Sequence, residues 1–389
     1  DAFTDPIMGY IADNTSTRWG KFRPYILFGS VPALIMIILC FTSPDLSQTG
    51  KFYWALFTYI TFTTLYTIIA IPVGSLIPAM TQDRDERTSL ASFRYLGASS
   101  GSIAVAVLTL PLVGLFSSPQ FGFPIVVGCL AVLGAIFAFL CFFNTKEVYS
   151  KPYEETIGIK KVTKMVFNNY PLHFVILALL TTWVANNIKQ LTVVYFVKYN
   201  LQLEAYFSPI LLGVILQIMF GAYLVNLIKH RFEKKTLFMI GTFLYVITDL
   251  IIYYITGYEN FWLLAFIATF GFIGFGMAGV MAWSMIADTI EYGEWKSGFR
   301  AEGVLNAAHV FVFKLSVGFS AWLAGVILES TDYVANAIDQ SPETLNGLFI
   351  MGYIFPAVAG TIAIIVTYFN KYDSNFYERI FSELKQRQS

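Results

Sequence analysis

The sequence predicts an all-α protein that crosses a lipid bilayer many times, and its composition and residue patterning both indicate this class. Of its 389 residues, 56% are hydrophobic and only 13% are charged, whereas soluble domains carry about 25% charged residues. The apolar residues are gathered in runs of roughly 20, the length that a helix needs to cross the hydrocarbon core. These runs lack the alternation over ~10-residue segments that is typical of membrane barrels.

Ten apolar segments are long enough to cross the membrane as helices, and a shorter one precedes them. The short segment, residues 1–13, has helical character and begins at Asp1 without a cap or a basic flank. We therefore expect a fragment that lacks a first helix and part of a second. The full spans are expected at about 25–43, 52–80, 91–116, 123–143, 171–197, 205–228, 235–256, 260–287, 303–329 and 345–369.

The basic residues between the spans are distributed unequally over the two sides of the membrane. The loops on one side carry only Lys51 and Lys198, whereas most other lysines and arginines lie in the loops of the opposite side and in the tail. Loops rich in lysine and arginine stay in the cytoplasm. The pattern thus predicts a multi-pass protein with a cytoplasmic C-terminus.

A polar stretch at 144–170 separates two halves that resemble each other weakly. Ser75-Leu-Ile-Pro precedes a charged loop, and Ser284-Met-Ile-Ala precedes another, at an offset of about 210 residues. Two repeats around a central loop are typical of transporters built from two helical bundles. The predicted parts are a truncated N-terminal bundle at 1–143, a central cytoplasmic loop at 144–170, a C-terminal six-helix bundle at 171–369 and a cytoplasmic tail at 370–389.

Two acids occur where charge is costly. An ionisable residue inside a membrane costs at least ~2.5 kcal/mol, and is therefore a functional candidate. Asp1 and Asp5 are one helical turn apart, and Pro6 frees a backbone carbonyl beside them. Thr67 and Pro72 place a hydroxyl and a second freed carbonyl within a later span. These oxygens suit a cation or a proton; the alternatives are a solvated pair at the membrane edge and an ordinary proline kink.

The basic residues within spans are candidates for binding a polar solute. Arg94 and Lys314 occupy equivalent places in the two halves, and Lys189 follows Asn187 closely. The alternative is that these long side chains reach the membrane surface, which is weakest for Lys314 and strongest for Lys189. Asp249 is a lone acid for which structural pairing with a neighbour is an equal alternative. A run of glycines near residues 271–279 predicts close helix packing.

Several classes of function find no support in the residues. The three histidines are scattered without the spacing of a metal site, and no glycine-rich phosphate loop with Lys-Ser or Lys-Thr occurs. The 25 basic and 25 acidic residues balance, so there is no broad basic surface for nucleic acid. We expect no cofactor, and no metal ion apart from Na⁺ at Asp1 and Asp5.

Four strings resemble the glycoside–pentoside–hexuronide:cation symporters of the major facilitator superfamily, and the likeness runs over nearly the whole chain. They are Asp1-x-x-x-Asp5-Pro-Ile-Met-Gly9, Arg18-Trp-Gly-Lys-Phe-Arg-Pro24, Thr81-Gln-Asp-Arg-Asp-Glu-Arg87 and Asp288-Thr-Ile-Glu-Tyr-Gly-Glu-Trp-Lys-Ser-Gly-Phe-Arg-Ala-Glu-Gly303. The resemblance implies two six-helix bundles, of which the first is incomplete here, a central cavity and alternating access. The chain differs from the best-known member at Ala70, an aspartate there, and at Gly74, a tryptophan there. Galactoside specificity is therefore not expected, and the choice between Na⁺ and H⁺ stays open.

The resemblance also assigns roles to residues. It implies a cation site at Asp1, Asp5 and Thr67 and a sugar-binding role for Arg94, and it matches Lys314 to the lysine of the family's eleventh helix. It implies in addition a cytoplasmic gating segment made of Asp13, Arg18, Lys21 and Arg23.

Together these observations predict import of a glycoside or related sugar by symport with Na⁺ or H⁺ across a bacterial inner membrane. An excess of cations at Arg94, Lys314 and Lys189 favours an anionic sugar, a uronide or sulfonated glycoside, and Asn187-Ile-Lys189 resembles the equivalent element of proposed sulfoquinovose importers. We expect a monomer that binds a small sugar and the lipid bilayer. The alternatives are an uncoupled facilitator or exporter of another solute, an inactive fragment, and a membrane-embedded enzyme, for which no catalytic cluster is visible.

Overall fold

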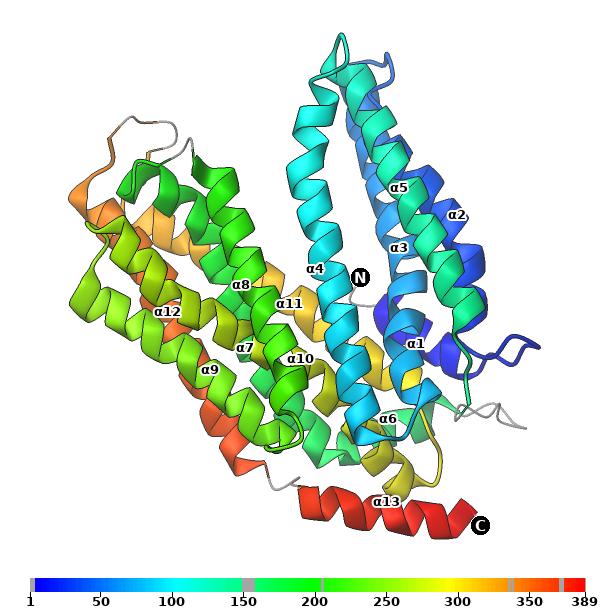
Figure 1. Cartoon of the computed structure of the whole chain (residues 1–389). Coiled ribbons are helices and arrows are strands. Elements are labelled where there is room, and N and C mark those ends of the chain that lie inside the picture. Colours follow the sequence, from blue (N-terminus) through cyan, green and yellow to red (C-terminus); the bar gives the residue numbers. More distant parts are fainter. Residues whose placement is uncertain are drawn as a thin grey trace. The chain divides into compact units, whose positions relative to one another are not determined.

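The structure is a computed structural model that describes residues 4–148, 158–203, 206–334, 337, 339–370 and 374–388. Over these residues the chain is helical, apart from loops and one isolated bridge between Thr17 and Gly20 (Figure 1). The predicted all-α class is therefore confirmed. Ten of the described helices are long and apolar enough to cross a membrane, and they match the ten predicted spans one for one.

The helices fall into two sets in chain order. The first half contains α1 (Thr4–Asp13), α2 (Arg23–Cys40), α3 (Gln48–Met80), α4 (Arg84–Val113), α5 (Pro119–Asn144) and α6 (Ile159–Asn168). The second half contains α7 (Tyr170–Tyr195), the π-helix η1 (Phe196–Asn200), α8 (Phe207–Ile228), α9 (Lys234–Ile251), the π-helix η3 (Ile252–Thr256), α10 (Phe261–Ser297), α11 (Glu302–Ser330), α12 (Pro342–Phe369) and α13 (Ser374–Gln388). The short α6 lies in the segment for which a central loop was predicted.

The chain forms two compact units that do not follow the predicted boundaries at every point. The first unit comprises Asp1–Arg87, Ser100–Asn168 and Lys296–Phe311, and the second comprises Thr88–Ser99, Asn169–Trp295 and Val312–Ser389. Part of α4 thus belongs to the second unit, and the beginning of α11 belongs to the first. The predicted division at 143 and 171 describes the internal repeat, and it stays a prediction.

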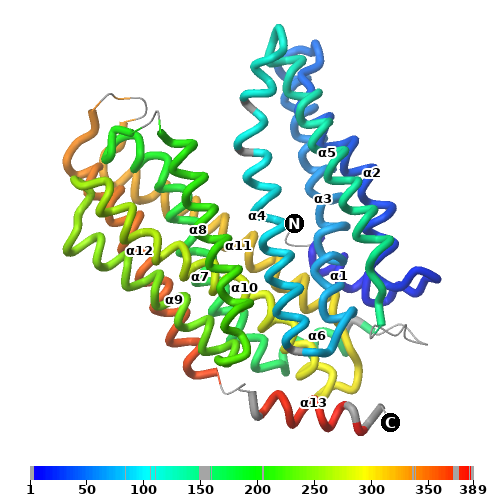
Figure 2. The backbone as a smooth tube through the Cα atoms, viewed as in Figure 1, coloured from blue at the N-terminus to red at the C-terminus, as the bar shows by residue number. Residues whose placement is uncertain are grey.

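In the first unit, α2 packs along both α3 and α5 (Figure 2). The short α1 also packs against α3 and contributes Met8 and Ala12 to a core that includes Phe22, Ile71 and Ala307. Ala307 comes from α11, so the beginning of that helix is part of this core. These contacts place the polar residues of α1 beside the middle of α3 and the first turns of α11.

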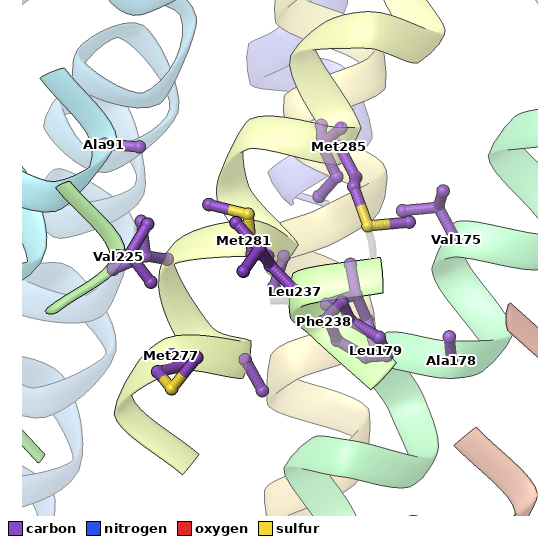
Figure 3. Packing of buried hydrophobic residues seen from close by; sticks show 14 of the residues in the cluster. Ala91, Val175, Ala178, Leu179, Val225, Leu237, Phe238, Met277, Met281 and Met285 are labelled. Carbon is purple, nitrogen blue, oxygen red and sulfur yellow. The ribbon is translucent and has the colours of Figure 1, made fainter. Parts of the chain in front are cut away.

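In the second unit, α10 is a central element. Its residues Met277, Met281 and Met285 are spaced by one helical turn, and they join a buried cluster with Leu237 and Phe238 of α9 (Figure 3). Met side chains are unbranched and adapt to irregular gaps between helices. The cluster also contains residues of α7, α8 and α12, so it holds much of the second unit together.

Glycines allow α10 to approach its neighbours closely, as the run near 271–279 predicts. A Cβ atom built on Gly241 of α9 would lie 2.5 Å from the backbone oxygen of Gly274 in α10. A Cβ atom on Gly276 would likewise collide with the backbone oxygen of Ile218 in α8. Small residues at helix interfaces let backbones approach in this way, and van der Waals packing then holds the helices together.

We expect Gly241→Ala to lower the thermal unfolding midpoint of the detergent-solubilised protein, because the added methyl group must displace backbone. Overpacking of this kind costs about 1–3 kcal/mol. The matched control is Gly213→Ala in α8, where an added Cβ meets no atom within 4 Å. An equal midpoint for the two variants would contradict the close approach of α9 and α10.

Candidate cation and substrate sites

The first candidate site joins α1 and α3 within the first unit. Thr67 Oγ1 donates a hydrogen bond of 3.0 Å to Asp5 Oδ1. Both side chains are buried, with exposed fractions of 0% for Asp5 and 1% for Thr67. The second predicted acid, Asp1, lies outside the described residues.

The surroundings of Asp5 suit a small monovalent cation or a proton. A carboxylate and a hydroxyl are hard oxygen ligands, and Pro72 within α3 leaves a carbonyl one turn earlier without its usual helical donor. Nearby, Asn306 Nδ2 of α11 donates to the carbonyl oxygen of Ile71 at 3.0 Å. The donor set therefore fits the predicted cation site, and burial of Asp5 makes a bound positive charge favourable there.

At the other end of α1, Asp13 caps the N-terminus of α11. Its Oδ1 accepts from the backbone N–H of Gly303 at 2.8 Å, and its Oδ2 accepts from that of Val304 at 2.9 Å. The carboxylate thereby satisfies two of the donors that a helix start leaves unpaired. Gly9 lies one turn earlier, and a Cβ atom there would come within 2.6 Å of the Gly303 oxygen, so the two helices touch.

The basic residues Lys21 and Arg23, just before and at the start of α2, contact the end of α5 and the segment that follows it. Glu147 accepts from the backbone N–H groups of Lys21 and Phe22 at 2.8 Å each and of Arg23 at 3.0 Å. The Arg23 guanidinium donates to the carbonyl oxygen of Phe142 and lies 4.6 Å from the centre of its ring. Glu147 thus acts as an anionic cap for α2.

Two features complete this predicted gating segment. Lys21 is buried, with an exposed fraction of 1%. The Arg18 guanidinium lies over the ring of Trp19, 4.3 Å from the ring centre. Arg18 and Lys21 thus lie in the loop between α1 and α2, and Asp13 and Arg23 lie at the two helix ends that this loop connects within the first unit.

The predicted substrate residues all belong to the second unit. The guanidinium of Arg94, on α4, lies 4.1 Å from the ring centre of Trp283 on α10. Asn187 Nδ2 on α7 donates a hydrogen bond of 3.0 Å to Ser316 Oγ on α11. Lys314 lies two residues before Ser316 and is half-buried. An arginine beside an indole ring offers hydrogen-bond donors and an apolar face, which together suit a sugar.

Lys189 lies in a different kind of environment. Its ammonium group forms an ion pair with Asp249 Oδ1 of α9, and both side chains are buried. The structure therefore shows Asp249 paired with a neighbour, which was one of the two alternatives for this residue.

Sequence reasoning missed several partners of the predicted residues. Gly303, Glu147 and Trp283 were not assigned roles from the sequence. The sequence string that ends at Gly303 resembles the family's own string, but it does not show that Asp13 caps this helix. Capping brings together two segments that are far apart in the sequence. A sequence without a structure gives no direct sign of that contact.

Comparison with known proteins identifies the family. The model of the family described as MFS/sugar transport protein matches residues 1–374. The chain belongs to this family. It is thus a membrane transporter, and the resemblance to cation symporters of glycosides is confirmed. The alternative of a membrane-embedded enzyme does not hold.

Relatives and solved structures agree with this assignment. The transporter is 35% identical to the uncharacterized symporter YjmB of Bacillus subtilis, over 99% of this chain and 84% of that protein. It is 32% identical to the isoprimeverose transporter of Lactiplantibacillus pentosus, over 100% of this chain and 81% of that one. The fold resembles that of the proton:xylose symporter XylE, with a TM-score of 0.69 at 14% identity, over 96% of this chain and 85% of XylE.

We expect Asp13→Ala to destabilise the transporter by about 0.5–2 kcal/mol, the usual contribution of a helix N-cap. Two backbone donors of α11 would lose their acceptor, and thermal unfolding in detergent would show a lower midpoint. Asp45→Ala is the control, because Asp45 lies exposed in the loop between α2 and α3. If both variants unfolded at the same temperature, the capping role of Asp13 would be excluded.

Proposed function

We propose that this transporter imports a glycoside or related sugar by symport with a monovalent cation, Na⁺ or H⁺, across a bacterial inner membrane. The observation that carries this proposal is the buried contact between Asp5 and Thr67. A carboxylate inside a membrane protein is expensive unless a positive charge compensates it. A transported cation supplies that charge for part of each cycle.

In this scheme, Asp1, Asp5 and Thr67 bind the coupling ion. Binding removes the repulsion between the two carboxylates and fixes α1 against α3. If the same arrangement favours sugar binding, then by linkage each ligand tightens the binding of the other. The gating segment formed by Asp13, Arg18, Lys21 and Arg23 would then control opening toward the cytoplasm, where we place the C-terminus.

The proposed sugar site uses Arg94, Lys314 and Asn187, with Trp283 as a surface for the sugar ring. Relatives support a sugar substrate, since they include the isoprimeverose transporter and the proposed sulfoquinovose importer of Escherichia coli K12, which is 32% identical over 100% of this chain and 84% of that protein. Two cationic side chains in one site favour an anionic sugar, because guanidinium binds carboxylates and sulfonates with two parallel hydrogen bonds. Lys189, predicted as a further ligand, is engaged by Asp249.

The coupling scheme predicts that Asp5→Asn abolishes uphill accumulation of sugar. The complete transporter in proteoliposomes would be tested with a radiolabelled glycoside under a sodium gradient, a proton gradient and neither. We expect one gradient to drive accumulation in the wild type and Asp5→Asn to equilibrate at most. The matched control is Asp45→Asn, which should accumulate normally.

Equilibration of the wild type under every gradient would overturn symport. An uncoupled facilitator or exporter would then be the better assignment. Monomeric behaviour is a separate expectation, and size-exclusion chromatography with light scattering tests it.

The anionic-sugar proposal predicts a particular order of competitors. A uronide or sulfonated glycoside should inhibit uptake more strongly than its neutral counterpart, and Arg94→Lys should weaken that preference by roughly tenfold, because lysine cannot form the paired hydrogen bonds. Competition assays with matched neutral and anionic glycosides measure this. Stronger inhibition by the neutral sugar would exclude the anionic class while leaving symport intact.

A further inference from the structure

The ion pair between Lys189 and Asp249 has no role in the transport scheme above. Lys189 lies in α7 and Asp249 in α9, and both helices belong to the second unit. The exposed fraction of the Asp249 side chain is 1%, and that of Lys189 is 11%. The pair therefore lies inside one helical unit, within two of the candidate membrane spans.

Stability alone explains such a pair poorly. Taking two charges out of water costs more than their attraction usually returns, and well-packed apolar residues often serve as well or better. Ionisable residues within membrane spans are accordingly rare and are associated with function. The surroundings of this pair indicate which function that is.

Three aromatic rings surround the ammonium group. Lys189 Nζ lies 4.7 Å from the ring centre of Tyr245, 5.2 Å from that of Phe272 and 5.0 Å from that of Tyr353. Each ring face attracts a cation. The ammonium group would therefore keep favourable partners if the charge of Asp249 were neutralised.

The carboxylate is satisfied on one side only. Its Oδ1 accepts from Lys189, whereas Oδ2 is buried and accepts no hydrogen bond from the residues that the structure describes. A buried charged oxygen that lacks a donor is destabilising. A proton on Oδ2 would remove that charge, and the rings would still hold the ammonium group.

A second buried pair in the same unit is arranged differently. Lys234 of α9 donates to both oxygens of Asp288 in α10, at 2.7 Å and 2.8 Å. The Tyr377 ring lies near this ammonium group, at 6.0 Å. Here both carboxylate oxygens are engaged, so this pair is a natural comparison for the first.

We propose that Asp249 is a proton-binding site of the second unit, separate from the cation site at Asp5. A proton from water bonds to Oδ2, the carboxyl group becomes neutral, and Lys189 stays protonated among the three rings. The hydrogen bond that links α7 to α9 weakens in this form. Loss of the proton to water restores the ion pair.

The titratable groups that face Asp249 come from three helices. They are Lys189 of α7, Tyr245 of α9 and Tyr353 of α12, while α10 contributes the phenyl ring of Phe272. Both paired helices also continue as π-helices beyond the pair, α7 into η1 and α9 into η3. Short π-helical segments occur frequently at functional sites, and the Tyr353 ring lies 5.6 Å from that of Phe196 in η1.

Infrared difference spectroscopy tests this proposal directly. Spectra of the complete transporter in lipid would be recorded as the pH is lowered. We expect a carboxyl C=O stretching band that grows in the wild type and is lost in Asp249→Asn. Asp288→Asn should keep that band, because it alters the comparison pair. If Asp249→Asn does not fold, Asp249→Glu should shift the frequency of the band.

A band of equal size in the wild type and Asp249→Asn, or one unmoved by Asp249→Glu, would overturn the proposal. The pair would then be a permanently ionised structural link. The measurement needs neither sugar nor a gradient, so its outcome is independent of whether Asp5 couples transport. Repeating it with Asp5→Asn, which should keep the Asp249 band, separates the two sites.

Discussion

A charge removed from water must be compensated within the protein, and the contacts of three buried carboxylates show this constraint. Asp13 is compensated by backbone donors of α11, and Asp249 by Lys189. Asp5 accepts a hydrogen bond from the Thr67 hydroxyl. A carboxylate with both oxygens engaged by the protein is a fixed structural element.

This difference distinguishes structural from functional charges on physical grounds. The carboxylate of Glu147 accepts three backbone N–H groups, which fixes the start of α2. Lys234 engages both oxygens of Asp288 in the same manner. By contrast, Oδ2 of Asp249 accepts no hydrogen bond among the described residues. We place a proton at this oxygen because the described part of the chain leaves it without a donor.

Much of the fold could be predicted from the sequence, because membrane spans depend on local composition. A run of apolar residues identifies a span wherever its partners lie. The helix α6 was missed because its ten residues are too few to cross a membrane and include three lysines, so that they resemble part of a polar linker. The π-helices at the ends of α7 and α9 were missed as well, since apolar periodicity does not distinguish them from α-helix.

The sites were predictable in part. Residue type and position within spans were enough to single out Asp5, Arg94 and Lys189, but they could not supply partners from distant segments. Lys189 shows the limit most clearly. As an isolated cation it was a reasonable substrate ligand, and only the packing of α7 against neighbouring helices brings Asp249 and three rings to it. Pairing is a tertiary property.

The division of α11 between the two units has a consequence for a chain that is split into two fragments. Its first turns, up to Phe311, belong to the first unit, and the remainder belongs to the second. A polypeptide cut in the central linker would leave the second fragment carrying a piece of the first fragment's core, with Ala307 in the cluster around Met8 and Ile71. If the two fragments were produced together, the beginning of α11 in the second fragment would pack into the core of the first fragment and hold the two together.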